Sequence, residues 1–176
     1  MSTQKNMETK TLIILSSLRK DSNTKLLTQK LFSGIDSETI DLLDFKISHY
    51  DYQGHYSETD QFLEVIEKVL LFETIVFATP VYWYSMSGLL KVFFDRLTDI
   101  VTTEKHIGRN LKGKNIFLVS VGTDLTLPEG FETPFRLTSD YLEMNFIETY
   151  YCPTKDLQDN LTNQNKFIKI IKSTNR

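Results

Sequence analysis

The sequence is poor in cysteine, glycine and proline, and each shortage excludes a class of protein. Its 176 residues include one cysteine, Cys152, which rules out an intramolecular disulfide framework and a cysteine-rich metal cluster. Only 7 glycines and 4 prolines are present, too few for a collagen-like or low-complexity chain. The three histidines, His49, His55 and His106, are spaced too irregularly for a zinc site, so we expect no metal.

Charge and hydropathy exclude two further classes. The net charge of −3, from 20 Lys and Arg against 23 Asp and Glu, offers no basic excess for binding nucleic acid. No apolar run approaches the roughly 18 residues of a membrane span. The polar start, Met1–Lys10, lacks the apolar stretch of a signal peptide. We therefore expect a cytoplasmic protein with a disordered tail over 1–10 and a single domain over 11–176.

Short apolar runs alternate along the chain with segments in which apolar residues recur every three or four positions. Strands are expected at 11–15, from 39, and at 74–78, 115–121 and 145–152, and helices within 26–32, 62–70, 86–100, 134–144 and 157–171. Ser85 is expected to cap the third helix, and 102–113 to be a loop. Alternation with continuous apolar strands is typical of a parallel sheet covered by helices on both faces. Five strands in this length favour an α/β, flavodoxin-like three-layer sandwich with strand order 2-1-3-4-5.

In such a sheet, ligands bind beyond the carboxyl ends of the strands, at the switch point between strands 1 and 3. This rule selects first the loop 16–24. The loop is rich in hydroxyl and amide side chains, contains Arg19 and opens a helix, a combination that suits a phosphate. It has neither the lysine of a P-loop nor the glycines of a dinucleotide fingerprint. The alternative is an ordinary capping cluster, in which Ser22 or Asn23 caps the helix.

The same rule selects the loop 79–88, which carries three consecutive aromatic residues, Tyr82, Trp83 and Tyr84. Three neighbouring rings cannot all point into one core. We therefore expect some of them to face the switch-point crevice and to pack on a planar ligand. The alternative is an aromatic cluster that only buries the loop.

The two loops resemble the NAD(P)H-dependent FMN reductase family of the flavodoxin superfamily. The resemblance spans about 10–172 and is carried by Ser17-Leu-Arg19, Ser22-Asn-Thr24 and the stretch PVYWYSMSGLLKVFFDR from Pro80 to Arg96. It implies FMN as cofactor and NADPH or NADH as hydride donor. The implied FMN contacts are Ser17, Arg19, Ser22, Asn23 and Thr24 at the phosphate, with Ser16 beside them; Pro80, Val81, Tyr82, Trp83, Tyr84, Ser85 and Met86 along the flavin; and Gly122, Thr123 and Asp124 at its pyrimidine edge.

The resemblance implies an oxidoreductase that passes electrons to a small acceptor such as a quinone, free flavin, azo or nitro compound. It implies no side chain as general acid or base, because the flavin carries the chemistry. The alternative is an FMN electron carrier of the flavodoxin type. Such carriers usually need strong acidic patches for docking, and a net charge of −3 favours that only weakly.

The third helix and the basic run after it carry further expectations. Phe93 and Phe94 together provide more apolar surface than the core-facing side of one helix needs, which suggests a homodimer contact. Lys91, Asp95 and Arg96 are expected to form surface or interface pairs. The basic run Lys105, Arg109, Lys112 and Lys114 is expected to be a solvated face, with contact to the phosphates of the nicotinamide nucleotide as the alternative.

Overall fold

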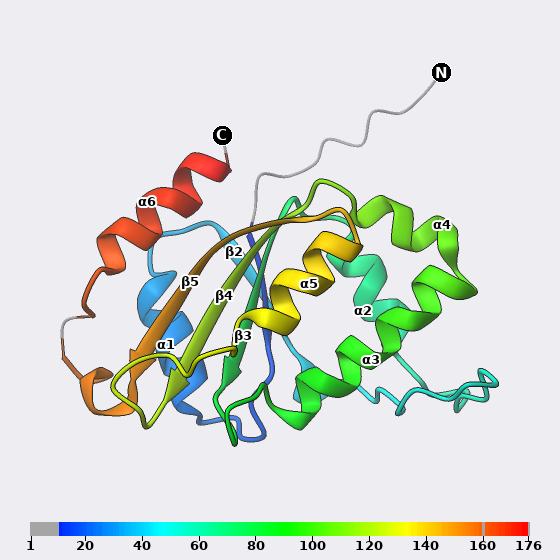
Figure 1. Cartoon of the computed structure of the whole chain (residues 1–176), viewed down its shortest axis with the longest axis horizontal. Coiled ribbons are helices and arrows are strands. Elements are labelled where there is room, and N and C mark those ends of the chain that lie inside the picture. The colour runs from blue at the N-terminus through cyan, green and yellow to red at the C-terminus, as the bar shows by residue number, and fades with distance from the viewer. Residues whose placement is uncertain (1–10, 160, 176) are drawn as a thin grey trace.

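The computed structural model describes residues 11–159 and 161–175, so the tail predicted over 1–10 lies outside it. The described residues form a five-stranded, all-parallel sheet in the order β2-β1-β3-β4-β5, as predicted (Figure 1). The strands are β1 (Thr11–Leu15), β2 (Ser37–Asp41), β3 (Thr74–Pro80), β4 (Asn115–Gly122) and β5 (Asn145–Pro153).

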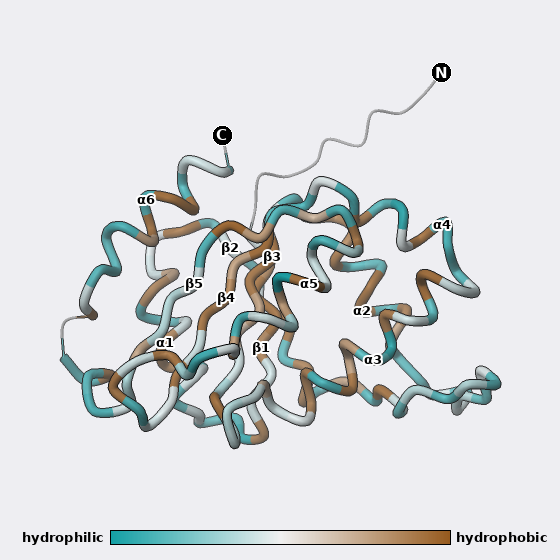
Figure 2. The backbone as a smooth tube through the Cα atoms, viewed as in Figure 1, coloured by the Kyte–Doolittle hydropathy of each residue, from teal (hydrophilic) through white to brown (hydrophobic). Residues whose placement is uncertain are grey.

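Helices cover both faces of this sheet. One face packs against α2 (Phe62–Val69), α3 (Gly88–Thr102) and α5 (Thr133–Tyr141), and the other against α1 (Asn23–Leu31) and α6 (Gln164–Thr174). A short α4 (Lys105–Gly108) and 3-10 turns at Leu42–Asp44, Arg109–Leu111 and Thr154–Asp156 complete the elements. Because helices lie on both sides, β1 and β3 are buried at every residue, and most of their length is brown in Figure 2.

Some predicted element boundaries are wrong. Ser87, and not Ser85, caps α3, because its Oγ accepts the N–H of Leu90 at 3.2 Å while Ser85 belongs to the preceding turn. The segment predicted as a loop over 102–113 contains α4 and a 3-10 turn. The closing helix begins at Gln164, because Leu157 and Leu161 enter the core from irregular backbone before it.

The two phenylalanines of α3 fill the core, and so they give no support to a dimer contact. Phe93 is buried against Phe62 and Phe77, with ring centroids 5.5 and 6.5 Å away. Phe94 packs edge-on against Phe77 and Phe135, at 5.1 and 5.3 Å. The aromatic residues of this helix are thus explained by the layer between the sheet and α5.

The charged residues of α3 and the basic run divide between surface and interior. Lys91 and Asp95 form the predicted surface pair, whereas Arg96 is buried and the expectation of a surface pair for it is wrong. Lys114 is also buried, and its Nζ donates to the carbonyl oxygens of Leu70 and Phe72, in the turn that follows α2. The basic run adjoins the amino end of β4, so it does not reach a nucleotide at the carboxyl edge.

Candidate functional site

The carboxyl ends of β1, β3 and β4 lie side by side at the lower edge of the sheet in Figure 1. Short hydrogen bonds join them. Ser16 Oγ donates to the carbonyl oxygen of Ala78 at 2.9 Å, and Ser120 Oγ donates to that of Thr79 at 2.8 Å. The N–H of Val81 donates to the carbonyl oxygen of Val121 at 2.9 Å. The loops after these three strands therefore start from one fixed platform.

The loop after β1 presents unused donors. Ser22 caps α1 by accepting the N–H of Lys25 at 3.2 Å, as one interpretation of the sequence expected. Within 11–159 and 161–175, however, no backbone N–H from Ser17 to Thr24 has a hydrogen-bond acceptor. A helix start with free N–H groups and a positive partial charge is a binding site for an anion. The loop therefore contains both the cap and a set of free donors that suits an anion.

Side chains of the same loop add to this cradle. The hydroxyl of Thr24 is buried and has no hydrogen-bond partner among the described residues. Leaving such a group unpaired costs about 1–3 kcal/mol, so the residues fit a phosphate whose oxygens accept from it. Ser17 is buried as well, whereas Arg19 and Asn23 are exposed at the rim. Ser16 differs, because its hydroxyl already donates to the carbonyl oxygen of Ala78 and so links the start of the loop to β3.

The loop after β3 is a tight hairpin turn. The N–H groups of Tyr82 and Ser85 donate to each other's carbonyl oxygens at 2.9 and 3.0 Å. Between them, Trp83 and Tyr84 have φ angles of 47° and 63°, a left-handed conformation that costs non-glycine residues roughly 1–2 kcal/mol each. Two-residue turns of this kind normally use Asn-Gly.

This turn holds all three aromatic side chains outside the core. Tyr82, Trp83 and Tyr84 are 43%, 93% and 68% exposed, which excludes a cluster that only buries the loop. Met86 turns inward, and the N–H of the buried Ser87 donates to Thr79 Oγ1 at 3.0 Å at the base of the loop. The strained backbone therefore keeps aromatic surface open beside the anion cradle.

The loop after β4 is held by two residues that the sequence analysis missed. Tyr151 Oη donates to the carbonyl oxygen of Asp124, and Thr154 Oγ1 to that of Gly122, both at 2.8 Å. A Cβ on Gly122 would lie 2.8 Å from Tyr151 Oη and 3.2 Å from Val81 Cβ, so a larger residue here would push Tyr151 aside. Burial, with Asp124 nearby, raises the pKa of Tyr151 and keeps it a donor at neutral pH. The sequence did hold a signal for these two residues, because the strand predicted at 145–152 also ends at the carboxyl edge of the sheet.

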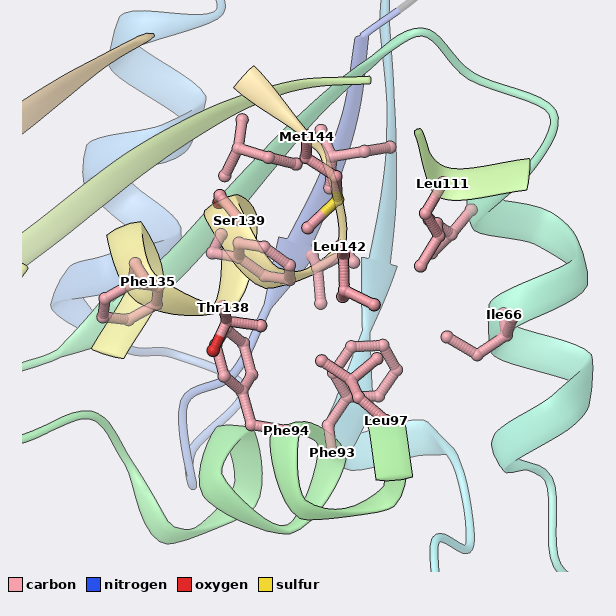
Figure 3. A pocket seen from close by; sticks show the side chains of 15 residues that line it. Ile66, Phe93, Phe94, Leu97, Leu111, Phe135, Thr138, Ser139, Leu142 and Met144 are labelled. Carbon is pink, nitrogen blue, oxygen red and sulfur yellow. The ribbon is translucent and has the colours of Figure 1, made fainter. Parts of the chain in front are cut away.

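An enclosed cavity lies elsewhere, between the sheet and α2, α3 and α5. Its volume is about 20 Å³, room for little more than a water molecule. Figure 3 shows side chains from these elements converging on it, among them Phe94, Leu97, Thr138 and Leu142. The cavity is a small packing gap in the core, too small for a planar cofactor.

The sequence matches the family model for NADPH-dependent FMN reductases over residues 9–151. The chain belongs to this family. The Bacillus subtilis protein YwqN, named as a provisional NAD(P)H-dependent FMN-containing oxidoreductase, is 30% identical over 119 residues, which cover 64% of this chain and 66% of YwqN. The chain thus spans about two thirds of that relative. The resemblance predicted from the two loops is confirmed.

Solved structures share the fold of this FMN reductase family member. An NADPH-quinone reductase from P. pentosaceus superposes with a TM-score of 0.64 at 16% identity, covering 95% of this chain and 97% of the other. General stress protein 14 of Treponema denticola, solved in complex with FMN, gives 0.64 at 15% identity, covering 92% and 99%. At these identities the likeness establishes the flavodoxin-like fold alone. Within the described ranges, no helix is long and apolar enough to cross a membrane.

Proposed function

We propose that this family member binds FMN at the carboxyl edge of its sheet, takes a hydride from NADPH or NADH, and passes electrons to a small acceptor. The observation that carries this proposal is the donor-rich cradle at 17–24, with the buried, unpaired hydroxyl of Thr24. The open aromatic turn 82–85 lies beside it. An anion and a flat ring on one ligand match these two features.

Each loop then has its own part in binding. Ser17, Arg19, Ser22, Asn23 and Thr24 would hold the phosphate through hydroxyl, guanidinium and backbone donors. The loop 80–86 would lie along the ring, and Gly122, Thr123 and Asp124 would contact its pyrimidine edge. Bound FMN would supply the hydride acceptor and the store of two electrons. The chain itself would orient both substrates and exclude water.

For the acceptor we propose a quinone, free flavin, azo or nitro compound. An open, flat aromatic surface favours planar acceptors of this kind. The second candidate function, an electron carrier that takes no hydride, requires docking by another protein. The exposed Trp83 and Tyr84 would serve that role too, so the response to nicotinamide nucleotide decides between the two.

We also propose that the protein works in the cytoplasm as a homodimer. Its one cysteine is buried and unpaired, as suits a reducing compartment. For a dimer, α5 exposes Leu137 and Tyr141, 61% and 75% accessible, beside a groove lined by Leu97 and Val101 of α3. Light scattering measures the mass, and a monomer over a wide concentration range contradicts the dimer.

The deciding experiment is an FMN titration followed by anaerobic addition of NADPH or NADH. We expect the apoprotein to take up FMN and the bound FMN to bleach with at least one nucleotide. Arg19→Ala should weaken FMN binding at least about tenfold, the loss of a charged hydrogen bond. A protein that takes up no FMN contradicts the proposal. Bound FMN that neither nucleotide bleaches favours the carrier.

A further inference from the structure

We propose that Tyr151 and Thr154 are positioning residues: they hold the loop after β4 so that the N–H groups of Thr123 and Leu125 face the pyrimidine edge of the flavin. The inference rests on the proposed function. It assigns to two hydroxyls from the end of β5 a role in setting how strongly reduced FMN is bound, although neither would touch the cofactor.

Two carbonyl groups of the loop after β4 are each held by one hydroxyl. Gly122 O accepts from Thr154 Oγ1 and Asp124 O accepts from Tyr151 Oη, both at 2.8 Å. A trans peptide group is planar, and its N–H points away from its C=O. Fixing the carbonyl of Gly122 therefore fixes the N–H of Thr123. Fixing the carbonyl of Asp124 fixes the N–H of Leu125 in the same way.

The N–H groups of Thr123 and Leu125 have no partner within the loop. They point away from the two hydroxyls of the β5 end, and in the described part of the chain neither has a hydrogen-bond acceptor. Thr123 and Leu125 are exposed, and the loop starts beside Val81 of the aromatic loop. Two donors without an acceptor next to the proposed ring site suit a negatively charged edge of a ligand.

Fixed N–H groups at this place would favour reduced FMN over oxidised FMN. Two-electron reduction of FMN by hydride leaves negative charge near N1 and O2 of its pyrimidine ring. Backbone N–H groups fixed in advance stabilise such charge without reorganising when it forms. They bind the reduced cofactor more tightly than the oxidised one and so raise its midpoint potential. Losing either hydroxyl releases one peptide group and weakens this preference.

The test uses three variants of the full chain. Tyr151→Phe and Thr154→Val each remove one hydroxyl. Tyr150→Phe is the matched control, because Tyr150 Oη also donates to a backbone carbonyl at 2.8 Å, that of Thr162, away from the loop after β4. For each variant, the dissociation constants of oxidised and reduced FMN, the midpoint potential and urea unfolding are measured. Amide exchange at residues 123–125 is followed in the apoprotein.

We expect Tyr151→Phe and Thr154→Val to bind reduced FMN roughly 3- to 10-fold more weakly relative to oxidised FMN, the effect of one hydrogen bond. Their midpoint potentials should fall and amide exchange at 123–125 should quicken. Thr154→Ser should restore the wild-type values, and Tyr150→Phe should change urea unfolding alone. Unchanged affinity ratios with FMN still bound overturn this inference and leave the proposed function standing. A wild-type protein that takes up no FMN overturns both.

Discussion

Arg96 Nη1 lies 2.8 Å from Asp60 Oδ2 in the interior, and this ion pair ties α3 to the segment that leads into α2. Arg96 Nε pairs with Asp99 at 2.7 Å, and the guanidinium stacks on the ring of Tyr56 at 3.5 Å. Arg96 Nη1 also donates to the carbonyl oxygen of Ser48 at 3.1 Å. One side chain thus fixes both ends of the segment 48–60.

Replacing Arg96 should therefore destabilise the protein strongly. Arg96→Met leaves the carboxylates of Asp60 and Asp99 buried without their cation, and breaking a buried pair in this way costs about 3–5 kcal/mol. Urea unfolding measures the loss. The control is Lys91→Met on the same helix, which breaks an exposed pair and should cost no more than about 0.5 kcal/mol. Equal losses in the two variants would contradict the assignment.

The same ion pair predicts how stability depends on pH. Burial raises the pKa of Asp60, but hydrogen bonds from Arg96, Ser48 N–H and Phe62 N–H outweigh it and lower the pKa to about 2. The folded protein therefore holds its Asp60 proton less tightly than the unfolded chain. This contributes roughly 2 kcal/mol above about pH 4, which is lost as the pH falls toward 2.

Urea unfolding between pH 2 and 7 checks this dependence. Asp60→Asn should be less stable than the wild type at pH 7 and should lose less stability between pH 4 and 2. Parallel curves for the two proteins over that interval would show that Asp60 is not the group that titrates.

Thr24→Val should separate stability from FMN binding. The buried hydroxyl has no partner among the described residues, so its loss should leave the apoprotein as stable or stabilise it by up to about 1 kcal/mol. FMN should bind about tenfold more weakly or worse, because a phosphate oxygen loses its donor. Calorimetric titration gives the affinity. Thr28→Val is the control, since Thr28 is buried one turn on and its hydroxyl donates to Lys25 O. It should lower stability with little change in FMN affinity.

The double variant Trp83→Asn with Tyr84→Gly should be more stable and less active. Asn-Gly adopts the left-handed turn readily, so removing the strain should stabilise the protein by about 1–2 kcal/mol. The open aromatic surface is lost at the same time, so FMN or the acceptor should bind more weakly. Urea unfolding and steady-state kinetics with a quinone measure the two effects. Undiminished kinetics would show that the rings contact neither ligand.

Much of the fold follows from patterns that are local in the sequence. Buried parallel strands are short apolar runs such as 11–15, and helices repeat apolar residues every three or four positions, as in 62–70. The strand order then follows from the number of βα units. The donor-rich loop 16–24 was also predictable, because its hydroxyl and amide side chains lie close together in the sequence at the start of a helix.

Other features depend on partners that are distant in the chain. Arg96 belongs by helical position to a polar face, but the segment 48–60 folds over it and makes that face interior. The hydroxyl of Ser16 donates to the carbonyl oxygen of Ala78, which lies 62 positions away in the sequence. The left-handed pair Trp83–Tyr84 contradicts the preference of its residue types, because the closing hydrogen bonds of the turn override it.

The sequence by itself determined the strand order and the family, and it predicts the edge of the sheet that carries the site. The single domain over 11–176 and the individual FMN contacts stay predictions. Only the tertiary structure decided which polar groups are free and which are already used. Whether a hydroxyl supports a loop, as in Ser16 and Tyr151, or has no partner among the described residues, as in Thr24, depends on neighbouring strands brought into register. Local periodicity holds no information about that register, because it is set when strands distant in sequence pair.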